Sequence, residues 1–127
     1  MTTESFTCTT TDGHAGPFAI PTDLMTGAAW VPATSGKRID ILNPATEAVL
    51  TSVADASSAE GRAAVDAAAA ASAAWAATAP RKRADILLAC FHAMMAEQEW
   101  LAQLIALENG KALSDARGEV AYAAEFF

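Results

Sequence analysis

The hydrophobic period of the sequence changes at residue 57, and this change limits the fold more than any other feature. Before residue 57 the apolar residues form short runs between Gly and Pro, whereas after it they recur at helical spacing up to residue 127. Ser57-Ser58-Ala59-Glu60 matches a capping box, in which a hydroxyl and a carboxylate bind free backbone N–H groups at a helix start. We therefore expect about four helices over residues 57–127.

The first two helices are expected to meet at Pro80. Proline suits the first turn of a helix, where its missing N–H costs nothing, and Thr78 is the expected cap. The second helix has the strongest apolar stripe in the sequence. The aligned residues are Val65, Ala68, Ala69, Ser72 and Trp75 in the first helix, and Leu87, Cys90, Phe91, Met94 and Met95 in the second.

The third helix is expected to end at Asn109-Gly110, a common C-cap, and the fourth is expected to open at Ser114 with Asp115. The fourth helix reaches Phe127 without the Gly, Asn or Pro stop signal that usually ends a helix. The aligned residues are Trp100, Leu101, Leu104, Ile105 and Leu107 in the third helix, and Val120, Ala123, Ala124 and Phe127 in the fourth.

The part of the chain before residue 57 is expected to hold one β-hairpin, over residues 28–55. Residues 38–42 form a short β-branched run, and Asn43-Pro44 forces a turn. A second run follows, with Val49, Thr51 and Val53 on one face and Leu50 and Ser52 on the other. An isolated hairpin is marginal in water and needs a surface to lie on. Residues 1–23 are rich in Thr, Gly and Pro without a sustained period, so we expect a flexible tail there.

Composition and charge exclude several functions. The formal net charge is −7, and the 8 Lys and Arg residues form no stripe, which argues against nucleic-acid binding. The run over residues 63–79 is too short and too rich in Ala to span a membrane. Two Cys residues make no disulfide framework, and the first residues lack the features of a signal peptide, so a cytoplasmic setting is expected.

Two motifs could belong to a phosphate-binding or a metal-binding site. Gly110-Lys111 could belong to a phosphate loop, but Ile105 and Ala112 stand where that loop needs Gly and Ser or Thr, so a helix cap is the better interpretation. Cys90 and His92 are two positions apart on a helix and point to different faces, which favours a core thiol over a metal site. His14 has no nearby partner of ligand type.

The carboxylates on the helices are candidates for acid–base work, but in an acidic protein a solvated helix surface is the default interpretation of them. No Gly-rich dinucleotide fingerprint follows either hairpin strand. The sequence therefore predicts no catalytic residue, no cofactor-binding residue and no metal ligand within this chain. The carboxylates considered are Glu97, Glu99 and Glu108, together with Glu119 and Glu125.

Taken in order, these motifs resemble the beginning of an aldehyde dehydrogenase. The stretch "LMTGAAWV" (24–31) resembles the opening strand of that family, and "RIDILNPATEAVLTSVADAS" (38–57) resembles its two strands linked by an Asn-Pro-Ala-Thr turn. The stretch "AAVDAAAAASAAWAATAPRKRADILL" (63–88) is similar to its first two helices. "ENGKAL" and "GEVAYAAEFF" (118–127) most resemble the succinate-semialdehyde dehydrogenase branch.

The sequence departs from the family pattern at two turns. Glu47 replaces the Gly usual after Asn-Pro-Ala-Thr, and Ala112 replaces the Pro usual after Gly-Lys. Both departures concern local turn geometry and leave the family resemblance intact.

The resemblance implies the N-terminal piece of the α/β aldehyde dehydrogenase fold, mostly helical, with residues 24–127 forming an incomplete part of the NAD(P)-binding domain. Family members oxidise aldehydes, here succinate semialdehyde, with NAD or NADP. A Cys thiolate attacks the aldehyde, hydride passes to the nicotinamide, and a Glu-activated water releases the acid. These catalytic groups lie downstream in the family, and Cys90 does not match its nucleophile motif.

The resemblance therefore implies a scaffold that is inactive alone and binds no cofactor. Its expected partner is the missing C-terminal remainder of an enzyme that is homo-oligomeric in the family. Two alternatives stay open: a non-catalytic helical module that binds a protein partner through an exposed apolar face, and an unrelated soluble bundle.

Overall fold

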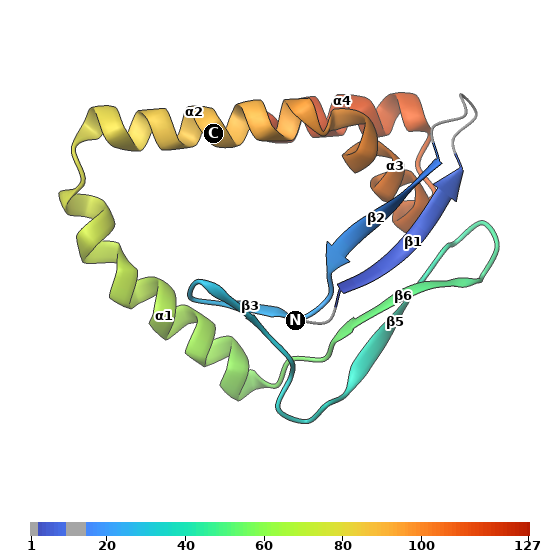
Figure 1. Ribbon diagram of the computed structural model, residues 1–127, viewed down its shortest axis with the longest axis horizontal. Coiled ribbons are helices and arrows are strands. Elements are labelled where there is room, and N and C mark those ends of the chain that lie inside the picture. The colour runs from blue at the N-terminus through green and yellow to red at the C-terminus, as the bar shows by residue number, and fades with distance from the viewer. Residues whose placement is uncertain (1–2, 10–14) are drawn as a thin grey trace. The chain divides into compact units, whose positions relative to one another are not determined.

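The computed structural model describes residues 3–9 and 15–127 (Figure 1). The chain divides into two compact units, and each is described by itself. The first unit comprises Met1–Leu42 and Ala48–Ala73, and the second comprises Asn43–Glu47 and Ala74–Phe127.

The described strands lie in the first unit. In the described residues they are three two-stranded antiparallel ribbons, each separate from the others. The expected single hairpin therefore corresponds to only one of them. The ribbons are β1 (Thr3–Thr9) with β2 (Ala15–Pro21), β3 (Leu24–Thr26) with β4 (Ala29–Val31), and β5 (Arg38–Leu42) with β6 (Val49–Ala54).

The β1–β2 ribbon lies within residues 1–23, where a flexible tail was expected from the sequence. The register runs from Thr3 opposite Pro21 to Thr9 opposite Ala15. Thr and Phe favour strands. Pairing between the two segments stabilises strands that the local hydrophobic period does not indicate. No strand was predicted for residues 3–9 and 15–21, and the flexibility of this segment stays a prediction.

The β3–β4 ribbon divides the expected 28–55 hairpin. Trp30 pairs with Met25 across a tight turn at Gly27, whose φ of 63° is the left-handed conformation that glycine adopts without strain. Residues 29–31 therefore belong to a ribbon of their own, and only the β5–β6 pair matches the hairpin predicted around Asn43-Pro44.

The Asn43-Pro44 turn between β5 and β6 is held by Asn43. Its side-chain oxygen accepts a hydrogen bond from the Ala45 N–H at 2.9 Å, and its backbone carbonyl accepts one from the Glu47 N–H at 2.8 Å. Glu47 has a φ of 59° and is the one described non-glycine residue with a positive φ. The residue that replaces the usual Gly is therefore the one in a left-handed conformation.

The helix α1 (Ser58–Ala77) begins with the predicted capping box. The Ser57 hydroxyl accepts a hydrogen bond from the Glu60 N–H at 3.3 Å, and the Glu60 carboxylate accepts one from the Ser57 N–H at 2.7 Å. No residue of α1 is buried in the described structure, so local capping and helix propensity fix this helix more than packing does.

The helix α2 (Pro80–Ala96) has Pro80 in its first turn, as predicted, but its cap differs from the prediction. The N-cap is Ala79, which makes no side-chain hydrogen bond, whereas the Thr78 hydroxyl donates back to the Ala74 carbonyl at 3.0 Å. The Thr78 prediction is wrong because this hydroxyl finds an acceptor at the end of α1. The Arg83 guanidinium also donates to α1, at the Ala76 carbonyl.

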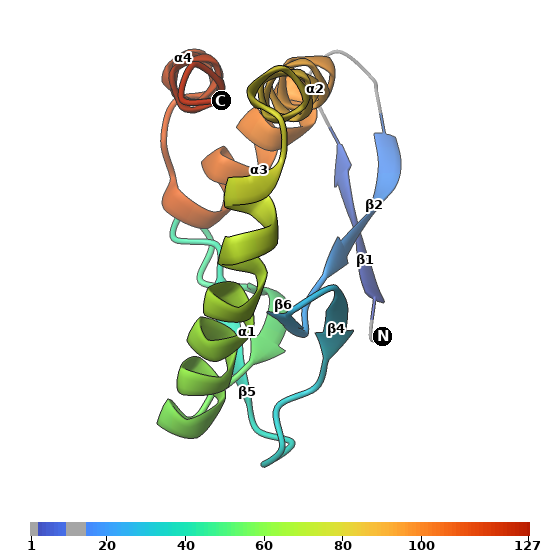
Figure 2. The same ribbon diagram turned by 90° about the vertical axis from the view of Figure 1, so that its left-hand side faces the viewer.

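The helices α3 (Gln98–Asn109) and α4 (Leu113–Ala124) form the small core of the second unit, and Figure 2 views α2 and α4 nearly along their axes. Gly110 ends α3 with a φ of 73°, which confirms the predicted C-cap. The helix α4 begins one residue before Ser114, after Ala112 at φ −59° and ψ 137°. Proline adopts these angles, so the change from the usual Pro leaves the backbone path intact. The core consists of Ala102, Ala116 and Val120, with Leu101, Ile105 and Leu113 packed against it.

The apolar stripes are only partly covered. No residue of α2 is buried; Leu87 is 38% exposed, and the other four stripe residues are half-buried. In α4, Val120 and Ala124 are buried as predicted, but Phe127 lies 51% exposed beyond the helix. The predicted spacing is correct, while the described chain buries only the α3–α4 part of it.

Replacing Glu47 with Gly should stabilise the chain, because a non-glycine residue in the left-handed region costs about 1–2 kcal/mol while Gly adds some unfolded-state entropy. We expect a net gain of about 0.5–1 kcal/mol in the free energy of urea unfolding, followed by circular dichroism. The matched change Ala45→Gly, at a residue without a positive φ, should lower stability instead. Equal effects of the two changes would contradict the assigned turn.

Replacing Gly110 with Ala should destabilise the second unit. The substituted residue would keep an unfavourable positive φ, and its Cβ would lie 3.1 Å from the Pro44 Cγ. We expect a loss of about 1–3 kcal/mol in the same unfolding measurement. As the control, Gly118→Ala in α4 meets no atom within 4 Å and should stabilise the helix by about 1 kcal/mol.

Candidate functional site

A partly buried polar cluster around Arg38 joins the start of β3 to the β5–β6 ribbon. The guanidinium donates to the Ser52 hydroxyl at 2.8 Å, to the Ser52 carbonyl at 2.6 Å and to the Thr22 hydroxyl at 2.6 Å. It also lies 3.3 Å from a carboxylate oxygen of Asp23, whose side chain is fully buried. Because these donors are engaged within the chain, the cluster holds the strands together and offers no free cation to a substrate.

This cluster was not predicted from the sequence. Its only signal in the sequence is a pair of opposite charges, Asp23 and Arg38, on either side of the β3–β4 ribbon. Nothing in the local pattern brings the two residues together, since their contact depends on how the ribbons pack.

Glu60 holds two separate segments of the first unit. One carboxylate oxygen accepts the Thr34 N–H at 2.6 Å, and the other accepts the Ser57 N–H at 2.7 Å. These hydrogen bonds, with the Thr34 N–H as the largest cause, lower the pKa of Glu60 from 4.5 to about 2. The group therefore stays ionised near neutral pH and works as a structural acceptor, because a general base needs a pKa nearer the operating pH.

Glu99 and Glu119 are the carboxylates of the helical surface with cationic partners. Arg117 donates two hydrogen bonds to Glu99, at 2.7 and 2.8 Å, and these lower the pKa of Glu99, with a further contribution from Gln103. Lys111 forms an ion pair with Glu119. All five carboxylates weighed above (Glu97, Glu99, Glu108, Glu119 and Glu125) are exposed, and the described contacts assemble no acid–base pair from them.

The Gly110-Lys111 motif is a helix cap with an ion pair. The Gly110 N–H donates to the Ala106 carbonyl at 2.9 Å, and the Lys111 ammonium contacts Glu119 from the next helix. The interpretation as a cap is confirmed by this geometry, which leaves no phosphate cradle between a strand and a helix.

Cys90 and His92 lie on α2 without a shared ligand. Cys90 is half-buried, and the exposed His92 places its ring edge-on to Phe91 at 5.5 Å between centroids. Over the described residues, no three His, Cys, Asp or Glu side chains gather in a way that could hold a metal ion. His14 lies outside the described residues, as does the side chain of Cys8.

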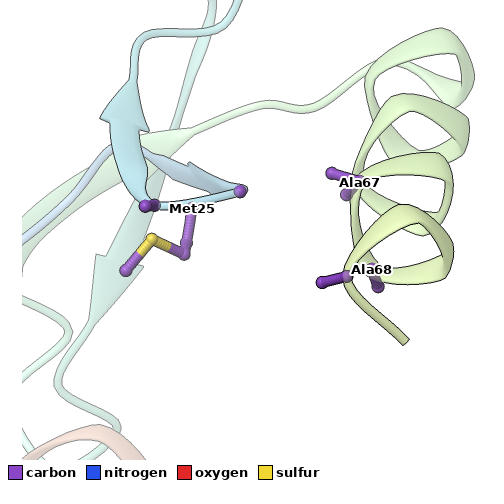
Figure 3. Close-up of a pocket in the computed structure, with 7 residues that line it drawn as sticks. Met25, Ala67 and Ala68 are labelled. Carbon is purple, nitrogen blue, oxygen red and sulfur yellow. The ribbon is translucent and has the colours of Figure 1, made fainter. Parts of the chain in front are cut away.

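An apolar hollow of about 490 Å³ opens between α1 and the β3–β4 turn (Figure 3). Ala67 and Ala68 point from the helix toward the ribbon that carries Met25. The lining residues bring no charged or hydrogen-bonding side chain, so the hollow does not fit a dinucleotide, whose phosphates need donors. The lining residues are Met25, Gly27, Ala28, Ala64, Ala67, Ala68 and Ala71.

Large apolar side chains are exposed on α1, α2 and α4. On α2, Leu88 is 52% exposed, and beyond α4, Phe126 is 73% exposed and contacts the Tyr122 ring edge-on at 5.1 Å. Apolar groups of this size outside a core are a common mark of an interaction surface. Within the residues that the structure describes, no helix has the length and apolar character needed to cross a membrane.

Comparison with known proteins gives the family. Residues 30–127 match the family model described as "Aldehyde dehydrogenase family". The chain therefore belongs to the aldehyde dehydrogenase family, and its strand pairs and four described helices are an N-terminal piece of that fold.

The similar proteins include semialdehyde dehydrogenases. The chain is 46% identical over 97 residues to the succinate-semialdehyde dehydrogenase [NADP(+)] GabD of Escherichia coli, and this match covers 76% of the chain and 20% of the relative. It is 44% identical over 98 residues to a glutarate-semialdehyde dehydrogenase of Pseudomonas aeruginosa, with 77% and 20% covered. The chain thus spans about a fifth of the length of these relatives.

Solved structures agree with this assignment. An E. coli NADP-dependent enzyme matches with a TM-score of 0.80 and 43% identity. The match covers 83% of this chain and 22% of the chain of that enzyme. A succinate-semialdehyde dehydrogenase from Burkholderia pseudomallei matches with a TM-score of 0.77 and 38% identity, and the match covers 80% of this chain and 21% of the other.

Replacing Glu60 with Gln should lower the stability of the chain at neutral pH, because the amide is a weaker acceptor than the carboxylate. The lowered pKa means that Glu60 stabilises the fold above pH 4.5 and loses this effect as the pH falls toward about 2. The urea midpoints of the parent chain and the variant should therefore converge over that range.

The matched control is Asp66→Asn, which removes one exposed carboxylate from the same helix. Its midpoint should stay close to that of the parent chain at each pH. A gap between the parent chain and Glu60→Gln that persists unchanged to pH 2 would contradict the assigned role of Glu60.

Proposed function

We propose that the chain is the N-terminal scaffold of an NAD(P)-dependent semialdehyde dehydrogenase whose substrate is succinate semialdehyde. The observation that carries the proposal is the 46% identity with the E. coli succinate-semialdehyde dehydrogenase, over 97 residues and 20% of that protein. Several other relatives with 36–51% identity carry the same activity in their names, and this supports succinate semialdehyde over glutarate semialdehyde.

The proposed chemistry uses a nicotinamide cofactor that accepts hydride from the substrate. Two of the relatives are named for NADP(+), and a similar solved structure is in complex with nicotinamide adenine dinucleotide, so the proposal covers NAD and NADP. The side chains that line the apolar hollow include no hydrogen-bond donor for such a cofactor. The residues of this chain are proposed to contribute no catalytic, cofactor-binding or metal-binding group.

The proposed role as a scaffold is supported by how the polar groups of the chain are used. The cluster at Arg38 joins strands, Glu60 joins the Thr34 loop to the start of α1, and the Glu99–Arg117 pair joins α3 to α4. Each of these interactions fixes one element against another. The same residues could not serve a reaction without breaking the contacts that place them.

The proposed partner is the remainder of the enzyme. A protein of the length of its relatives would contain about three times as much chain again, and exposed apolar groups such as Leu88 and Trp75 are suited to contact it. We further propose a homo-oligomeric, cytoplasmic enzyme without nucleic-acid or membrane partners.

The test is reconstitution. The chain is co-expressed with the part of E. coli succinate-semialdehyde dehydrogenase that follows its matched segment, and reduced cofactor is followed with succinate semialdehyde and either nicotinamide. We expect no turnover by the chain alone and turnover by the co-purified pair. Turnover by the chain alone, or a remainder that is equally active without it, would contradict the scaffold.

Leu88→Asp should reduce both the co-purification and the activity of the pair at least tenfold, because about 1.4 kcal/mol of lost contact is tenfold in binding. The control Ala89→Asp adds the same charge at the next exposed residue of α2, where the parent side chain is only a methyl group. Co-purification without turnover would favour the alternative of a non-catalytic helical module that binds a protein partner.

A further inference from the structure

We infer that Asn109 is a site of spontaneous deamidation whose rate is set by opening of the α3 C-cap. Asn109 is the last residue of α3, is exposed, and makes no side-chain hydrogen bond within the described part of the chain. It is followed by Gly110, which has no side chain to hinder attack at its backbone nitrogen.

The reaction needs only water. The Gly110 backbone nitrogen attacks the side-chain carbonyl carbon of Asn109, forms a new C–N bond and gives its proton to the leaving amide nitrogen, which departs as ammonia. Water then opens the resulting cyclic imide at either carbonyl. Opening at one carbonyl gives aspartate at position 109, and opening at the other gives isoaspartate, in which the backbone runs through the former side chain.

The structure controls access to the nucleophile. The Gly110 N–H donates to the Ala106 carbonyl at 2.9 Å, and Asn109 has a helical backbone. Attack requires that hydrogen bond to break and the Asn109 backbone to leave its helical conformation. The last turn of α3 must therefore open before the reaction, and helix ends open at a lower free energy than the whole fold does.

The product disturbs the turn that it forms in. An aspartate at position 109 adds a negative charge next to Glu108, at the end of α3 where the helix dipole is already negative. Isoaspartate also lengthens the backbone by one carbon beside Gly110, where a Cβ would already lie 3.1 Å from Pro44 Cγ. The reaction is therefore expected to loosen the contact between the α3 C-cap and the Asn43-Pro44 turn.

The chain contains its own control. Asn43 is the other Asn in the sequence, and it is followed by Pro44, which has no N–H and cannot form the same imide. Trypsin separates the two residues, because cleavage at Arg38, Arg62, Arg83 and Lys111 puts Asn43 in peptide 39–62 and Asn109 in peptide 84–111.

In the experiment the chain is aged at mildly alkaline pH in heavy-oxygen water, with and without urea, and then digested and analysed by mass spectrometry. We expect amide-to-acid conversion in peptide 84–111 with isoaspartate as a product, none in peptide 39–62, and loss of the signal in Asn109→Gln. Conversion should be several-fold faster in urea. An absence of conversion in urea, or equal conversion at Asn43, would contradict the assignment of Asn109 as a deamidation site. Equal rates with and without urea would contradict the claim that opening of the C-cap sets the rate.

Discussion

The scarcity of buried large side chains is the constraint on which the rest of this structure depends. No large side chain of the described residues is fully buried, and the core of the second unit consists of two Ala residues and one Val with three partly buried neighbours. Each buried methyl group contributes only about 0.8 kcal/mol, so this core supplies little stability for its length of chain. Local hydrogen bonds therefore carry an unusual share of the order, as the Glu60 capping box and the Asn43 turn illustrate.

The same constraint explains why the helices present so much apolar surface. An Ala-rich helix such as α1 can approach a neighbouring backbone closely but cannot bury much area against its own chain. Its exposed Trp75 and the half-covered stripe of α2 are suited to contacts with additional protein. The chain belongs to the aldehyde dehydrogenase family and spans about a fifth of the length of its relatives. In the proposed function, the partner of these apolar faces is the remainder of the enzyme.

Local signals were predictable from the sequence, and contacts between distant segments were not. The start of α1, the Pro80 turn and the Gly110 cap follow from residues next to one another, and all three agree with the structure. The prediction of Thr78 as a cap was wrong because its hydroxyl donates to a carbonyl of the preceding helix. The β3–β4 strands are three residues each, too short to show alternation, and the Arg38 cluster unites positions that only packing brings together. The Glu47 departure was visible in the sequence, but its positive φ required coordinates.

Amide hydrogen exchange, resolved by peptide, tests the central claim that the helices of this chain need a covering partner. The account predicts that amides of α1 and α2, which bury no residue, exchange much faster than those around Ala102, Ala116 and Val120, and that they become protected when the rest of an aldehyde dehydrogenase is present. If α1 and α2 in the isolated chain were already as strongly protected as the α3–α4 core, and gained nothing from the added protein, the account would be contradicted.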